Sequence, residues 1–391
     1  MSRNRGGFIG TDGLDAPDPP TGVAASGVAT SLSVSFTAPT DTGTSAITGF
    51  RAQASGVGTS GTSSPLTITG LTEGTSYNVS VWAINAYGYS APSDAVSASP
   101  AAPRGVFAGG YADNSSNVID YIQIATDGNA TDFGDLTRTT AFYPGSTSSS
   151  TRGVFSGGFN GGSTHTNIID YITIASTGDA TDFGDLSVAS KFGHAHASTT
   201  RGVITLGRTA SSSLNTIEYI TIANTGNTTD FGNLSAAKDH GASCASPTRG
   251  VIVLGEATNT IEYITIASTG NTTDFGNLTQ NTDNGAGGVS SETRGVFFLN
   301  PDTSTQIQYV TIASTGNATD FGDVSAASAS GMTGAVSSST KGVTQVGAGA
   351  GLAGKLEKIT IASTGNGATF GDLTTARYAV GGCSNDHGGL Q

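Results

Sequence analysis

A basic residue followed by Gly-Val recurs six times along the last three quarters of this chain. These markers begin at Arg104, Arg152, Arg201, Arg249, Arg294 and Lys341. A second shared segment follows each marker, first as Ile119-Asp120-Tyr121-Ile122 and last as Leu356-Glu357-Lys358-Ile359. A period of about 40–50 residues with several short strands per unit is typical of a β-propeller. We therefore expect residues 101–391 to form six similar blades.

The unit around the fourth marker predicts four strands, at residues 241–245, 249–255, 260–268 and 272–278. Their apolar residues lie on both faces, which indicates sheets packed between neighbouring sheets. Arg104 has no repeat-type strand before it, whereas the last unit continues into an unmatched strand at residues 376–383. We expect this C-terminal strand to complete the first blade, which leaves no exposed edge between the two ends.

Composition excludes several classes of function. The net charge is −13 with 16 basic residues spread along the chain, so we expect no nucleic-acid partner. No apolar run approaches the roughly 20 residues that a membrane span needs, so no membrane insertion is expected. The first ten residues lack the apolar segment of a signal peptide, which predicts synthesis and folding in a cytoplasm.

The first hundred residues have a different pattern from the repeats. Residues 1–16 form an arm without periodicity, in which Phe8 and Ile9 are the only apolar pair and the candidate anchor to a partner. Over residues 17–100, short alternating runs such as Leu32, Val34 and Phe36 predict an antiparallel β-sandwich.

Three segments of this region carry a resemblance to the fibronectin type III domain. They are Pro19-Pro20-Thr21-Gly22-Val23, the run from Leu71 to Tyr77, and the segment Asn85-Ala86-Tyr87-Gly88-Tyr89-Ser90. The resemblance implies that Tyr77 forms the tyrosine corner of such domains. It also implies that Phe36 takes the place of the usual strand-B tryptophan.

The repeats resemble known families as well. Gly109-Gly110 and Gly157-Gly158, each after an apolar strand, resemble kelch-type propellers. The nearly verbatim unit Arg-Gly-Val-Phe…Ile-Asp-Tyr-Ile-Thr-Ile-Ala-Ser-Thr-Gly-Asn-Ala-Thr-Asp-Phe-Gly-Asp-Leu resembles repeats of virion proteins of marine tailed phages, such as tail-fibre or decoration proteins. The fold class expected is therefore all-β: a fibronectin type III-like β-sandwich followed by a six-bladed kelch-like β-propeller closed by the C-terminal strand.

Recognition is expected where the six units disagree. In a blade, the connections after the second strand and those that lead into the next blade share one face, and here they vary in length and chemistry, as recognition loops do. Neutral drift of surface loops is the alternative. Aromatic and polar residues on such a rim would suit a sugar face. The candidate rim residues are Tyr111, Phe142, Tyr143, Phe159, Lys191, Phe192, Lys238, His240, Arg377 and Tyr378.

No catalytic or metal-binding pattern stands out. The five histidines fall at different repeat positions. The Asp132…Asp135 pair recurs as Asp…Asp in two other units and becomes Asp…Asn or Thr…Asp in the remaining three. With one copy per blade along an outer edge, these carboxylates do not converge. We expect no cofactor and no metal. Cys244 and Cys383 occupy the same position three units apart, too far for a disulfide, which predicts two free thiols.

These features predict a non-enzymatic phage virion structural protein, present in many copies per particle. Residues 1–100 would bind other virion proteins, and the propeller would attach to a host surface glycan or receptor, or decorate the particle. A carbohydrate-binding, lectin-like propeller is the first alternative. A propeller-fold enzyme acting on glycans is the second.

Overall fold

The computed structural model describes residues 15–390 except 29, 73–74, 101, 140–143, 161, 163, 283–285, 300–303, 326–333 and 347–350. The candidate anchor Phe8-Ile9 and the candidate rim residues Phe142 and Tyr143 lie outside the described residues. The protein is all-β and divides into two compact units, residues 1–102 and 103–391. In the described residues, no helix has the length and apolar character to cross a membrane.

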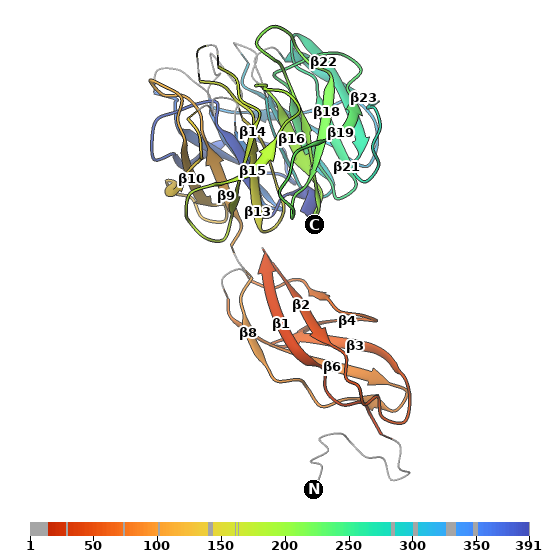
Figure 1. The fold of residues 1–391 in the computed structure, drawn as a ribbon. Coiled ribbons are helices and arrows are strands. Elements are labelled where there is room, and N and C mark those ends of the chain that lie inside the picture. Colours follow the sequence, from red (N-terminus) through yellow and green to blue (C-terminus); the bar gives the residue numbers. More distant parts are fainter. Residues whose placement is uncertain are drawn as a thin grey trace. The chain divides into compact units, whose positions relative to one another are not determined.

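The first unit is a sandwich of two antiparallel sheets, as the alternation of its apolar residues predicts (Figure 1). One sheet contains β1 (Thr21–Val28), β2 (Ser31–Thr37) and β5 (Leu66–Ile68). The other contains β4 (Val57–Gly61), β3 (Ile47–Ala54), β6 (Tyr77–Asn85), β7 (Gly88–Tyr89) and β8 (Val96–Ala98). Leu32, Val34 and Phe36 point into its core.

The two residues that the resemblance singled out have the expected structural roles. The backbone N–H of Thr72 donates a hydrogen bond of 2.9 Å to the Tyr77 hydroxyl, which is the tyrosine-corner contact. Phe36 is 8% exposed and packs on Phe50 with ring centroids 4.8 Å apart. A phenylalanine therefore fills the core at this position.

The second unit consists of six four-stranded antiparallel sheets, here called sheets 1 to 6. The first strands are β32 (Gly381–Ser384), β12 (Gly145–Ser148), β16 (His194–Ala197), β20 (Ala242–Ala245), β24 (Ala286–Ser290) and β28 (Ala335–Ser337). The second strands are β9 (Arg104–Ala108), β13 (Arg152–Ser156), β17 (Arg201–Thr205), β21 (Arg249–Val253), β25 (Arg294–Leu299) and β29 (Lys341–Gln345).

The shared segment noted in the sequence forms the third strand of each sheet. These strands are β10 (Val118–Gln123), β14 (Ile168–Thr173), β18 (Thr216–Thr221), β22 (Thr258–Thr265), β26 (Gln306–Thr311) and β30 (Lys355–Thr360). The fourth strands are β11 (Thr131–Asp135), β15 (Thr181–Asp185), β19 (Thr229–Asn233), β23 (Thr273–Thr282), β27 (Thr319–Asp323) and β31 (Ala368–Asp372). A short 3₁₀ helix, η1 (Gly388–Leu390), follows the last strand.

Sheet 1 is built from both ends of the second unit, and the expected pairing of the C-terminal strand is confirmed. β32, drawn in blue in Figure 1, pairs antiparallel with β9. The backbone N–H of Arg104 donates to the Asn385 side-chain oxygen at 2.7 Å. In sheets 2 to 6 the marker N–H donates instead to a serine hydroxyl at this position, as Arg249 does to Ser246 at 3.1 Å. In sheet 1 the first and second strands come from opposite ends of the unit, and Asn385 there accepts the hydrogen bond that a serine accepts in the other sheets.

Replacing Asn385 with alanine is expected to lower the stability of the second unit by about 1–2 kcal/mol, because the Arg104 N–H loses its acceptor. Asn385→Ser restores the acceptor found in the other sheets and should cost less. Urea unfolding of the full chain measures both. Equal losses of unfolding free energy in the alanine and serine variants would show that this side-chain hydrogen bond does not stabilise the contact between Asn385 and Arg104.

The marker residue joins each sheet to the next. The guanidinium of Arg104 lies 4.3 Å from the Tyr121 ring of its own sheet and donates to the backbone oxygen of Ile174 in sheet 2 at 2.8 Å. Arg152, Arg201, Arg249 and Arg294 repeat both contacts. Lys341 in sheet 6 donates to the backbone oxygen of Ala125 in sheet 1 at 3.0 Å. The contact between the sixth and first sheets therefore follows the same plan.

The glycine after each marker is required by the preceding sheet. A Cβ on Gly250 would lie 2.0 Å from Nε2 of His196, and one on Gly295 would lie 2.4 Å from the Cys244 sulfur. The same position in the other sheets faces Cys383, Thr147, Val289 or Val336. Only glycine leaves room for these first-strand side chains, which explains why the repeat carries Gly after its basic residue.

Cys244 and Cys383 both pack against the marker glycine of the next sheet and are free thiols, as expected. Burial raises the pKa of Cys244 and raises that of Cys383 to about 12. Both groups are therefore protonated at neutral pH and poor nucleophiles.

Candidate functional site

Four aromatic residues from the variable connections meet in one cluster, here called the aromatic cluster: Tyr111, Phe159, Phe192 and Tyr378. Tyr111 and Phe159 follow the second strands of sheets 1 and 2, whereas Phe192 and Tyr378 precede the first strands β16 and β32. Tyr111 and Tyr378 exchange two backbone hydrogen bonds, of 2.9 and 3.0 Å. The variable connections of sheets 1, 2 and 3 thus share a common surface.

The rings of this cluster pack mainly on one another. Phe159 and Phe192 are only 6% and 7% exposed, with ring centroids 6.1 Å apart. His165 stacks on Phe159 at 5.6 Å, and the Lys191 ammonium lies 3.7 Å from the Phe159 centroid. The expectation of an open aromatic rim is therefore wrong for the two phenylalanines, because neighbouring side chains cover their faces.

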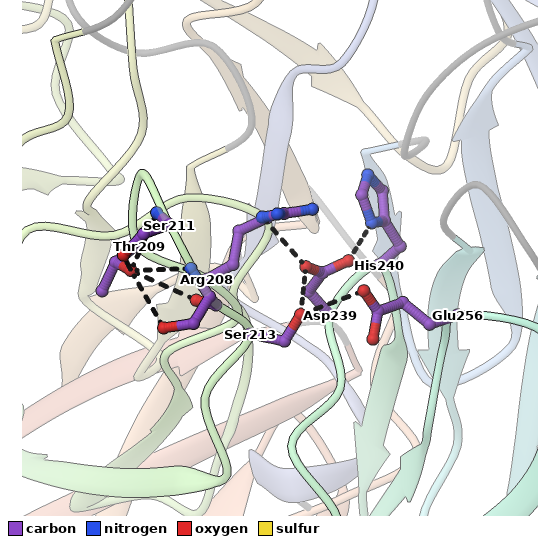
Figure 2. A network of polar contacts seen from close by, with 8 residues as sticks. Arg208, Thr209, Ser211, Ser213, Asp239, His240 and Glu256 are labelled. Carbon is purple, nitrogen blue, oxygen red and sulfur yellow. Dashed lines mark hydrogen bonds and ion pairs between the residues drawn. The ribbon is translucent and has the colours of Figure 1, made fainter.

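A polar network consists of Arg208, Ser213, Asp239, His240 and Glu256 (Figure 2). It adjoins the aromatic cluster, because the His240 and Phe192 ring centroids lie 3.7 Å apart. The carboxylate of Asp239 is fully buried and receives a hydrogen bond from the Ser213 hydroxyl at 3.0 Å. Its other oxygen contacts Nδ1 of His240, and Nε of Arg208 lies 3.4 Å away. Burial acts to raise the pKa of Asp239, but the His240 hydrogen bond and charge hold it below its usual value.

Serine, histidine and aspartate meet in this network, but not in the order of a nucleophilic triad. Ser213 and His240 both bind the Asp239 carboxylate. In a triad the histidine accepts the serine proton and the carboxylate orients the histidine from the far side. Over the described part of the chain, no three His, Cys, Asp or Glu side chains are grouped so that they could hold a metal ion.

Backbone strain is concentrated on the same surface. Phe192, His240 and Ala379 have φ of 59°, 57° and 56°, and each stands two residues before a first strand. Glu256 and Ala257 are also left-handed, with φ of 53° and 60°. Residues with a side chain adopt this conformation at a cost of roughly 1 kcal/mol or more, and they occur preferentially at functional sites.

Two further candidates have structural contacts. Arg377 is fully buried, pairs with Asp120 at 2.8 Å and donates to the backbone oxygen of Gly109, so its assignment to the rim is wrong. A buried guanidinium needs such a carboxylate, which stands on a strand far away in the sequence. Lys238 donates to the backbone oxygen of Glu256 at 3.1 Å and thereby ties two connections together.

Arg208, Ser213, Asp239 and Glu256 were not among the candidate rim residues predicted from the sequence. A signal for two of them was present, because Tyr111, Phe159, Arg208 and Glu256 all stand seven residues after their marker. Asp239 carries no such signal, since its burial depends on contacts with Arg208 and Ser213 of the preceding sheet.

The six first strands line a narrow cavity of about 60 Å³. Its lining includes Ser148, Ser290, Ser337 and Ser384, together with His196 and His387. The C-terminal segment lies against the ends of the first strands, where a Cβ on Gly389 would lie 1.8 Å from the backbone oxygen of Ala197. Small side chains and glycine are required here because the strands approach one another closely.

Comparison with known proteins identifies the first unit. Residues 18–99 match the family model of the fibronectin type III domain, so the chain contains this domain. A comparison with curated protein sequences gave no match.

Three solved structures are similar to about a fifth of the chain. Domains A168–A170 of titin are 30% identical, over 22% of this chain and 32% of that one, with a TM-score of 0.20. The twitchin kinase region of C. elegans is 22% identical, over 21% and 16%, with a TM-score of 0.20. The FN5 domain of Drosophila Lar is 23% identical, over 22% and 98%, with a TM-score of 0.19. The chain thus spans well under half of the titin and twitchin structures.

Proposed function

We propose that the second unit is a six-bladed, kelch-like β-propeller, and that the protein is a non-enzymatic structural protein of a phage virion that displays this propeller for attachment or decoration. The propeller is supported by the repeated joints between sheets. The marker contacts recur from each sheet to the next, and Lys341 makes the corresponding contact from sheet 6 to sheet 1. Such a disc is rigid and suited to holding variable loops in fixed positions.

One observation carries the display function: the variable connections of sheets 1 to 4 form one continuous surface. The aromatic cluster and the polar network meet there, with Phe192 and His240 rings 3.7 Å apart. The turns of the other face repeat almost unchanged, with Ser-Thr-Gly-Asn at 268–271 and 314–317. Chemical variety confined to one face of a uniform scaffold is typical of a recognition surface.

Attachment to the particle is assigned to residues 1–100. The fibronectin type III domain exposes Tyr87 and Tyr89, 47% and 52% accessible, on the turn and strand that follow β6. Exposed tyrosines are favourable contacts in protein interfaces because they combine a large apolar ring with a hydroxyl. Phe8 and Ile9 of the arm remain the proposed anchor.

The test is to locate the protein on purified particles. Antibodies against residues 18–99 and against residues 103–391 are applied to intact virions and followed by electron microscopy. Labelling by the second antibody, with weaker labelling by the first, is the result expected if the domain is buried in the particle. Absence of the chain from purified virions would refute the virion assignment.

A lectin-like role is the second candidate, and the polar network favours it. Several hydrogen-bonding side chains stand together on one surface, which is what recognition of sugar hydroxyls requires. Adsorption of the full-length protein to host cells, and its loss after the cells are treated to oxidise surface glycans, would separate attachment from a purely architectural role.

A further inference from the structure

Two cations stand opposite each other between the aromatic cluster and the polar network. Lys191 and Arg208 form an isolated antiparallel bridge and exchange two backbone hydrogen bonds, both of 2.9 Å. Directly opposed residues of an antiparallel pair project their side chains to the same side, and like charges placed so are destabilising. Burial and the charge of Arg208 lower the pKa of Lys191, in that order of importance.

Neither cation is fully satisfied within the described residues. The Lys191 ammonium lies over Phe159 and Phe192, 3.7 and 4.5 Å from their centroids, and has no oxygen partner among the residues described. Arg208 uses only Nε, on Asp239, and its side chain is 33% exposed. The two terminal guanidinium nitrogens have no hydrogen bond to the described chain. Among the described residues, the carboxylate that acts on both cations is Asp239, which also binds Ser213 and His240. The second carboxylate of the network, Glu256, binds the Ser213 hydroxyl at 2.9 Å.

We propose that Lys191 and Arg208 bind a single carboxylate group carried by an acidic sugar. The fork of a guanidinium matches a carboxylate with two parallel hydrogen bonds, and a neighbouring ammonium adds a point charge. A bound carboxylate would supply an oxygen partner to the Lys191 ammonium and to the terminal nitrogens of Arg208. The net charge of −13 repels polyanions, so an isolated acidic group on an otherwise neutral ligand suits the protein better.

The surroundings favour a sugar over a peptide. Ser211 and Ser212 are exposed beside Arg208, in a loop held by the Thr209 hydroxyl, which accepts their backbone N–H groups at 3.3 and 3.2 Å. Figure 2 shows Thr209 and Ser211 next to Arg208, with Glu256 on the far side of Ser213. Hydroxyl and carboxylate groups pair with sugar hydroxyls. The phenylalanine rings, by contrast, are covered and offer no pocket for an apolar peptide side chain.

The inference rests on the proposed display function and can fail separately from it. The full-length protein is titrated with N-acetylneuraminic acid and with glucuronic acid by calorimetry and by ligand-observed NMR, and in parallel with their neutral methyl esters. We expect the free acids to bind and the esters to bind at least tenfold more weakly. Esters that bind as well as the acids, or acids that do not bind, would overturn the carboxylate site.

Variants assign the binding to these two residues. Arg208→Gln should lower the affinity for both acids by roughly 10–100-fold, since a charged hydrogen bond is lost. Lys191→Met should also lower this affinity. Arg208→Lys keeps the charge without the fork and should fall between wild type and Arg208→Gln. Lys355→Met, at an exposed ion pair with Asp372 on sheet 6, is the control and should change nothing.

The outcomes separate the two proposals. Unchanged affinity in Arg208→Gln, with thermal unfolding like wild type, refutes the site. If the protein is found on virions and adsorbs to host cells but binds neither acid, the display function is supported and the carboxylate site is refuted. If the protein binds both acids through Arg208 but is absent from virions, the carboxylate site is supported and the virion assignment is refuted.

Discussion

Acidification from pH 7 to pH 4 is expected to destabilise the second unit steeply, because three histidines are buried there with no acidic hydrogen-bond partner among the described residues. Burial lowers the pKa of His194 to about 4, of His196 to about 3 and of His387 to about 4. In the unfolded chain each histidine takes up a proton near pH 6.5, so the unfolded state binds more protons throughout this interval. Stability is complete above pH 6.5 and falls toward pH 4 by up to about 1.4 kcal/mol per pH unit for each histidine.

Urea unfolding of the full chain at a series of pH values measures this slope. His196→Val is the matched variant, because Val289 fills the same position against Gly342 in the next sheet. We expect the variant to fold at pH 7 and to lose about one third of the pH dependence below pH 6.5. Parallel stability curves for wild type and His196→Val would contradict the assignment of acid sensitivity to this histidine.

Gly250→Ala is expected to destabilise the second unit by about 3 kcal/mol, since the added methyl group would lie 2.0 Å from Nε2 of His196. The histidine ring is 5% exposed, so little space is left beside it to take up the added methyl group. Chemical unfolding of single and double variants tests the cause. In a His196→Ala background the same glycine substitution should cost much less, and an unchanged cost would mean that the glycine is needed for its backbone alone.

Much of the fold could be predicted from the sequence because the same pattern of strands recurs in six units. The pairing of the C-terminal strand with the strand at Arg104 could be predicted from a missing partner at one end and an extra strand at the other. The reason for glycine after each marker could not. It lies in the preceding sheet, about 50 residues away along the chain, and only the packing of Gly250 against His196 reveals it.

The candidate site was predictable in position more than in chemistry. Alignment of the repeats brings Tyr111, Phe159, Phe192 and Tyr378 to one face, and they do meet there. Their exposure was not predictable, because it depends on how Lys191 and His165 lie over the rings. Arg377 shows the same limit: its partner Asp120 lies 257 residues away, and nothing local to Arg377 indicates a buried ion pair.

The joint between sheets 6 and 1 differs from the other five in one respect that bears on how such an array can grow. Lys358 stands where the first five sheets have a tyrosine, and it pairs with Asp127, which Lys341 also approaches at 3.6 Å. The corresponding turn residues of sheets 2 to 5 are threonines. A unit duplicated between sheets 2 and 5 would find matching neighbours on both sides, whereas one copied from sheet 6 would face a turn without the carboxylate. Gene duplication could therefore lengthen the middle of the array, while the terminal pair keeps its own complementary charges.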